Sequence, residues 1–283
     1  MRAHLIRTLV ICISLVAWGT AAVAAPVTIE NNGAWARIWP EIADPDQGMD
    51  IWTINAPDGV DWNIMHQQWF WYSVDAGSGP GPESPLEALD ATPFVFTSDG
   101  DGDTVHDTAF LRYTDNTQGL EISVRYILTG GPDWSGVSDI AEIINISNIG
   151  NASFTVHFFQ FCQFNLSVDE DVVQITQPNT AAQWFNTLRT TETVATRTPT
   201  AFQAGLAADL LALLNDTGPT VLDGTTGPLT GEVGWAFQWD VDLNPGEALL
   251  ISKDKSVILM PEPATLALAG LGAAALLARR RRR

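Results

Sequence analysis

The stretch LEISVRYIL, residues Leu120–Leu128, alternates apolar and polar side chains. Ile122, Val124 and Tyr126 fall on one side of an extended chain, and polar residues lie between them. A period of two over this length is typical of a strand with one buried face. Residues 234–243, with the sequence GWAFQWDVDL, repeat the pattern. The sequence therefore predicts a fold built from β-strands.

Further strands are predicted where short apolar or alternating runs are separated by Gly, Pro, Asn or Asp. These runs are residues 34–39, 49–55, 69–74, 94–97, 108–113, 141–147, 153–164 and 248–252. We interpret residues 141–147 and 153–164 as one hairpin. Residues 234–243 and 248–252 are interpreted as a second hairpin, around the turn Asn244-Pro245-Gly246.

Residues 203–214 show leucines at three- and four-residue spacing, which predicts one short helix. Many short strands with a single helix predict a mainly β fold, an antiparallel β-sandwich. No segment between residues 25 and 260 has the composition of a linker, so we expect one domain over this range.

The chain of 283 residues has 14 Lys and Arg against 33 Asp and Glu, a net charge of −19. Phosphate backbones would repel so acidic a protein, which argues against a nucleic-acid partner. No GxSxG elbow is present, so no catalytic residue and no catalytic activity are predicted. Cys162 lies in an apolar strand and is interpreted as a buried structural residue.

The first 24 residues have the pattern of a signal peptide. A basic start, Met1–Arg7, precedes the apolar run Leu9–Trp18. Small residues then occupy positions 22 and 24, so we predict cleavage by signal peptidase after Ala24. The alternative is a retained membrane anchor, although the apolar run is about half of the 20 residues that a spanning helix needs.

The C-terminal end, residues 261–283, has three parts in a fixed order. Pro261, Glu262 and Pro263 precede the apolar stretch Ala264–Ala278, for which we predict a transmembrane helix. A basic run ends the chain, and it consists of Arg279, Arg280, Arg281, Arg282 and Arg283. The positive-inside rule keeps these arginines in the cytoplasm and places the preceding chain across the membrane. A plain tail anchor is the alternative.

These three parts resemble the PEP-CTERM sorting signal of Gram-negative bacteria. The resemblance implies that exosortase processes the protein after a transient stay in the inner membrane and that the product reaches the cell surface or the extracellular space. Hosts of this family commonly make exopolysaccharide and biofilm matrix. Residues 158–183 loosely resemble uncharacterised exported proteins of the same group.

The run Asp99-Gly100-Asp101-Gly102-Asp103 places three carboxylates at alternate positions. Calcium takes six to eight oxygen ligands, so Asp99, Asp101 and Asp103 form a candidate calcium site. The spacing resembles the first half of an EF-hand loop but departs from it, because Thr104 stands at position six and Phe110 at position twelve. A solvated acidic loop without metal is the alternative.

Six tryptophans lie between residues 35 and 71, and Trp69 and Trp71 fall on one side of a predicted strand. Exposed rings of this kind stack on sugars, so this pair is a candidate glycan-binding face; a place in the core is the alternative. We expect a structural or interaction protein of the cell surface or extracellular matrix. The alternative is an extracellular domain that binds, or cleaves, carbohydrate.

Overall fold

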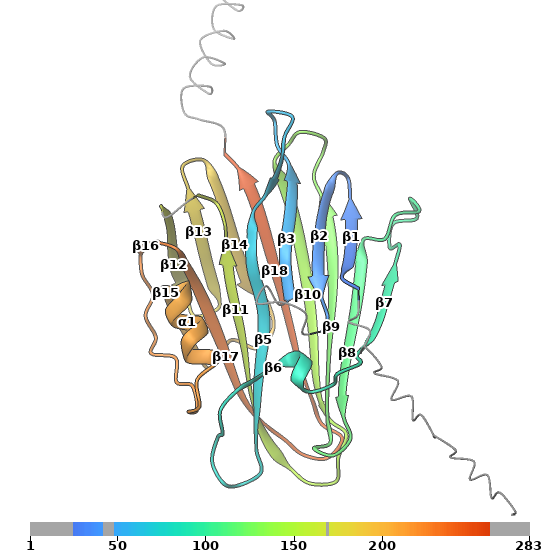
Figure 1. Ribbon diagram of the computed structural model, residues 1–283, viewed down its shortest axis with the longest axis vertical. Helices are drawn as coiled ribbons and strands as arrows, with labels where there is room; N and C mark the ends of the chain where they lie inside the picture. Colours follow the sequence, from blue (N-terminus) through green and yellow to red (C-terminus); the bar gives the residue numbers. More distant parts are fainter. Residues whose placement is uncertain (1–24, 42–47, 168–169, 261–283) are drawn as a thin grey trace, which may run out of the picture.

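The computed structural model describes residues 25–41, 48–167 and 170–260. They form two antiparallel sheets packed face to face, with one α-helix, so the predicted mainly β sandwich is confirmed (Figure 1). The predicted signal peptide and the predicted sorting helix lie outside the described residues. Within the described ranges, no helix has the length and apolar character needed to cross a bilayer.

The first sheet contains the N-terminal strands and three later ones. Its strands are β1 (Val27–Asn31), β2 (Ala34–Trp39), β3 (Gly48–Asn55), β4 (Asp61–Asn63), β5 (Met65–Asp75), β6 (Ser84–Pro85), β11 (Phe154–Phe164), β15 (Ala201–Leu206) and β17 (Val233–Leu243). The order across the sheet is β1-β2-β3-β5-β11-β17-β15, and β4 and β6 pair with β3 and β5.

The second sheet contains the strand that includes residues 120–128. Its strands are β7 (Phe94–Ser98), β8 (Thr108–Asp115), β9 (Leu120–Gly130), β10 (Val137–Asn148), β12 (Asp171–Gln177), β13 (Thr180–Phe185), β14 (Leu188–Val194), β16 (Leu229–Gly231) and β18 (Ala248–Leu259). The order is β16-β12-β13-β14-β18-β10-β9-β8-β7, which makes β7 an edge strand.

Both predicted hairpins were wrong. β10 and β11 lie in different sheets, as do β17 and β18, so each connection carries the chain across the sandwich. The two crossings are tied together at Asn148, whose side-chain amide donates hydrogen bonds to the carbonyls of Ala152 and Leu243 at 2.8 and 2.9 Å. Strand periodicity shows that a strand has a buried face but not which sheet it joins.

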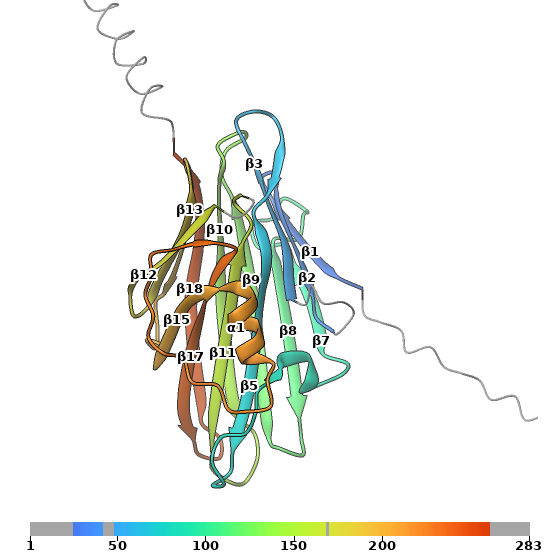
Figure 2. The ribbon, with the colours of Figure 1, turned by 60° about the vertical axis from the view of Figure 1, so that its left-hand side comes forward.

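The helix α1 (Ala207–Leu214) is shorter than predicted, because residues 203–206 belong to β15 and pair with β17. Figures 1 and 2 show α1 lying on the outward side of the first sheet, where it contacts β11, β15 and β17. Two leucines of the helix, Leu210 and Leu214, are buried. The short 3₁₀ helix η1 (Leu86–Ala88) packs against β5.

The space between the sheets holds four charged side chains, all fully buried: Glu142, Glu192, Lys253 and Lys255. We call these four residues the ionic cluster. Lys253 Nζ lies 2.6 Å from Glu142 Oε2 and 3.2 Å from Glu192 Oε1. Lys255 Nζ contacts Glu142 and lies 3.8 Å from Glu192 Oε1. Two positive and two negative groups thus balance within the interior.

Uncharged polar groups add hydrogen bonds to the ionic cluster. Glu192 accepts hydrogen bonds from Gln160 Nε2 at 2.9 Å and from the indole of Trp235 at 3.1 Å. Gln68 donates to Glu142 at 3.4 Å and accepts from Lys255 Nζ at 3.2 Å. Burial of a charge is strongly unfavourable unless it is paired and hydrogen-bonded. Glu142 and Lys255 have both kinds of contact, whereas Lys253 Nζ and Glu192 Oε1 are ion-paired without a hydrogen bond.

The outward side of β10 and β18 carries a second pair of carboxyl groups, Asp139 and Asp254. The two side chains lie close enough to share a hydrogen bond. Partial burial and the charge of Asp254 together raise the pKa of Asp139 to about 7. The folded protein therefore holds a proton here that the unfolded chain would release near its ordinary pKa of about 4.

This pair predicts a pH dependence of stability. Because the folded pKa is above the unfolded one, the stability contributed by the proton is complete below about pH 4 and is lost as the pH rises through about 7. Asp139→Asn should remove this loss of stability, because an amide does not titrate. After allowance for solvent screening, the variant should gain about 1–2 kcal/mol over the wild type between pH 4 and pH 8. Urea unfolding at pH 4 and pH 8 measures this difference, and Asp216→Asn, at an exposed position, is the control. Parallel curves of unfolding free energy against pH for the wild type and Asp139→Asn would contradict the prediction.

Candidate functional site

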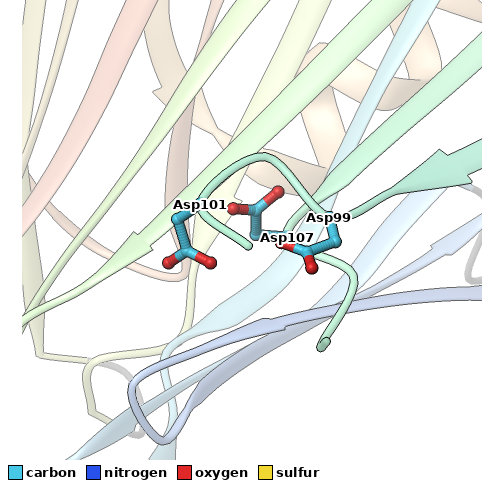
Figure 3. A group of neighbouring side chains, drawn as sticks. All are labelled: Asp99, Asp101 and Asp107. Carbon is cyan, nitrogen blue, oxygen red and sulfur yellow. The ribbon is translucent and has the colours of Figure 1, made fainter. Parts of the chain in front are cut away.

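The loop between β7 and β8 gathers three carboxylates. Asp99, Asp101 and Asp107 each place an oxygen within 4.8 Å of the other two (Figure 3). The structure thus brings two of the three predicted calcium ligands together and adds Asp107, which sequence spacing did not select. Asp103 is not a member of this group, and its carboxylate accepts a hydrogen bond from the Val105 N–H at 2.8 Å.

Backbone and side-chain donors hold the loop in this shape. Asp99 accepts hydrogen bonds from the Gly102 and Thr104 N–H groups at 2.6 and 2.8 Å, and these bonds hold the pKa of Asp99 below its ordinary value. Asp107 accepts one from the Gly100 N–H at 2.9 Å. Asp101 is fixed by Asn31 Nδ2 at 3.0 Å, which ties the loop to β1.

Three ionised carboxylates at this separation repel one another, and a divalent cation between them would remove the repulsion. Carboxylate oxygens are the ligands that calcium prefers, and the backbone carbonyls of a loop with water can complete its shell. The donor set therefore fits calcium, and Asp99, Asp101 and Asp107 are the residues that would hold it.

The predicted glycan face at Trp69 and Trp71 is not at the surface. Both rings are buried, with exposed fractions of 0 and 1%. The Trp69 indole donates to Glu87 of η1 at 2.5 Å, and the Trp71 indole donates to Asn215, at the end of α1, at 3.1 Å. The two helices cover these rings, so neither can stack on a ligand, and that prediction was wrong.

Exposed rings lie instead on β7. Phe94 and Phe96 share the outward side of this edge strand and are 50 and 55% exposed. Phe110 of β8 lies directly opposite Phe96, and its ring centroid is 6.3 Å from that of Phe94. Arg112 places its guanidinium 5.0 Å from the Phe94 ring. We call Phe94, Phe96 and Phe110 the phenylalanine platform.

The platform borders a hollow of about 370 Å³. Besides Phe96 and Phe110 its walls include Thr108 and Arg125, which supply a hydroxyl and a guanidinium group. Gly100 of the acidic loop also lines it, so the platform and the candidate calcium ligands are neighbours. Apolar ring faces beside a few hydrogen-bonding groups can bind a sugar, by stacking on its C–H face and pairing with its hydroxyls.

A larger hollow, of about 560 Å³, lies where the end of β5 meets the turns before β9 and β11. Amide and hydroxyl side chains line much of it, among them Asn116, Gln118 and Ser153. Its one aromatic residue, Phe154, is only 7% exposed, so this hollow offers no open ring face.

Solved structures with the same fold include sugar-active proteins. A GalM/aldose epimerase homologue from C. elegans aligns with 84% of this chain and 99% of its own, at 8% identity and a TM-score of 0.55. A bacterial glucoamylase solved in complex with acarbose aligns with 87% of this chain and 34% of its own, at 10% identity and a TM-score of 0.53. Identities this low establish the fold alone. A search of curated proteins found no match to the chain.

These comparisons correct one expectation. The absence of catalytic motifs led us to predict a protein without catalytic activity, and the shared fold contradicts that prediction, because enzymes acting on sugars have this architecture. The GxSxG elbow is a feature of a different fold. Function resides in sites that differ between proteins of one fold, so the function of this chain has to be inferred from its own side chains.

Calcium should stabilise the protein through the acidic loop. At a concentration about 100-fold above its Kd, calcium would add about 2.7 kcal/mol, which raises the Tm by about 5–10 °C for a domain of this size. Asp101→Asn and Asp107→Asn should abolish the increase. Asp103→Asn is the matched control and should retain it, because Asp103 lies outside the group. Differential scanning calorimetry with calcium and with EDTA measures this. Equal Tm values for the wild type under the two conditions would reject the calcium site.

The last 23 residues of the chain match a family of sorting signals. The PEP-CTERM protein-sorting motif matches residues 261–283, the segment that contains the Pro-Glu-Pro sequence and the arginine run. The match confirms the resemblance drawn from the sequence and supports an exported protein that is processed at the membrane. The chain therefore carries a PEP-CTERM sorting motif at residues 261–283.

Proposed function

We propose that residues 25–260 form an exported carbohydrate-binding domain whose ligand stacks on the phenylalanine platform. The observation that carries the proposal is the exposure of Phe94 and Phe96 on one side of an edge strand. Large apolar side chains that cluster at a surface usually mark a binding site. Here the rings also border a hollow that is partly lined by polar groups. An entirely apolar partner would leave the hydrogen-bonding groups of these walls without partners.

Several features favour a sugar over another ligand. Arg125, on β9, makes no ion pair with any residue that the structure describes, so its guanidinium donors are available to hydroxyl or carboxylate groups of a ligand. The high negative charge of the chain argues against nucleic acid, whose bases also stack on exposed rings. The fold is shared with proteins that act on sugars.

The two ends of the chain supply the route to the outside. In this proposal signal peptidase cuts after Ala24, and exosortase acts at Pro261–Pro263 while the arginine run holds the chain in the inner membrane. The mature domain, residues 25–260, is then delivered to the cell surface or the extracellular matrix. Exopolysaccharide is the carbohydrate that it would meet there.

Phe96→Ala should weaken carbohydrate binding about tenfold, because loss of one stacked ring costs on the order of 1–2 kcal/mol. Isothermal titration or affinity electrophoresis with a panel of soluble polysaccharides measures the effect. Trp134→Ala removes an exposed ring outside the platform and serves as the control. Binding that survives Phe96→Ala and Phe94→Ala but is lost in Trp134→Ala would place the site elsewhere, and no binding to any polysaccharide would reject the proposed function.

Processing at the C-terminus should depend on both charged parts of the sorting signal. Replacement Glu262→Gln, or deletion of residues 279–283, should leave unprocessed protein in the inner membrane. Cell fractionation with intact mass measurement of the secreted form reports both cleavages. Glu247→Gln, in the turn between β17 and β18, is a control of the same chemistry. Normal secretion of both altered chains would contradict the assignment of these residues.

A further inference from the structure

One corner of the ionic cluster combines an amine, a carboxamide and a carboxylate in mutual contact. Lys255 Nζ lies 3.2 Å from the side-chain oxygen of Gln68. Glu142 contacts the same amine through Oε1 and accepts a hydrogen bond from Gln68 Nε2 at 3.4 Å through Oε2. All three residues have exposed fractions of 0%. A carboxylate that touches both the amine and the amide nitrogen is placed to move protons between them.

We propose that Lys255 and Gln68 become joined by an isopeptide bond, with Glu142 as the residue that transfers the protons. The bond would link β5 of the first sheet to β18 of the second. The proposal concerns a modification of the interior and is independent of carbohydrate binding at the surface.

The reaction transfers the acyl group of Gln68 to the amine of Lys255 and releases ammonia. Lys255 Nζ gives one proton to Glu142 and attacks Cδ of Gln68, which forms the new C–N bond. Glu142 passes its proton to Nε2 of Gln68 and takes a second one from Nζ. The Cδ–Nε2 bond then breaks, and ammonia leaves. The products are an amide, ammonia and a protonated Glu142, so total charge is unchanged and no oxidant, reductant or activated co-reactant is needed.

The surroundings favour this chemistry. The charges of Glu142 and Glu192 outweigh the effect of burial and raise the pKa of Lys255, which opposes loss of its proton. The direct contact with Glu142 supplies the base that takes this proton. Removing an ion pair from a fully buried site is favourable, because each buried charge carries a desolvation cost. The reaction would leave Lys253 paired with Glu192 at 3.2 Å, so the interior stays neutral.

The neighbouring groups make Lys255 the reacting residue. Lys253 contacts two carboxylates and the ring of Phe70 at 5.0 Å, and among the described residues it makes no hydrogen bond to a carboxamide oxygen. Cys162 is directly opposite Gln68 in the β5–β11 register, so a thioester to the same carbonyl would also expel ammonia. Burial, with the charge of Glu192, raises the pKa of the Cys162 thiol well above its ordinary value, which disfavours the thiolate that must attack.

The intact mass of the purified full-length or exported protein tests the proposal. We expect a deficit of one ammonia, together with a proteolytic fragment in which the peptide containing Gln68 is linked to the one containing Lys255. Lys255→Met should restore the full mass. Lys253→Met is the matched control, since it removes an equally buried lysine and should keep the deficit.

Three results would overturn the inference. One is a full mass for the wild-type protein, which needs no variant and so holds even if Lys255→Met fails to fold. Another is a deficit that persists in Lys255→Met. The last is a deficit that disappears with hydroxylamine or in Cys162→Ser, which would indicate a thioester in place of the isopeptide bond.

Discussion

Four charges without access to water constrain the register of the central strands. Lys253 and Lys255 take inward positions on β18 that would otherwise continue the apolar row of Leu249, Ile251 and Val257. Glu142 pairs directly with Lys253, and Glu192 pairs directly with Lys255, so the partners come from the strands on either side. A slip of one residue would turn both lysines outward and leave two buried carboxylates unpaired.

The sequence predicted the strands whose pattern is local and failed where the pairing is distant. Residues 120–128 and 234–243 alternate clearly and are strands in the structure. The segment 171–194 escaped prediction because its strands are rich in Thr and Gln, which mimic loop composition. The alternation of β18 places Lys253 and Lys255 on its buried face, but their charge predicts exposure. Only the glutamates on β10 and β14 allow these lysines to be buried.

The candidate site was predictable to the extent that it is local in sequence. Asp99 and Asp101 followed from their spacing, whereas Asp107 joins them because the loop closes through its bond to the Gly100 N–H. The aromatic prediction chose the wrong rings. Trp69 and Trp71 lie on a central strand that helices cover, and this cover depends on the tertiary structure. Phe94 and Phe96 lie on an edge strand, and that position depends on the order of all nine strands in the described second sheet.

An exposed apolar edge strand is a liability, because its free backbone groups can pair with another chain. The protein limits this risk around β7 without removing the rings. The guanidinium of Arg112 covers part of Phe94, and the loop that follows β7 carries Asp99, Asp101 and Asp103, which repel a second copy of so acidic a chain. A protein selected only for solubility would replace Phe96 with a polar residue at no cost to the core, since that ring is more than half exposed. Protection that surrounds the rings and leaves their faces open is the arrangement expected when the rings have a ligand.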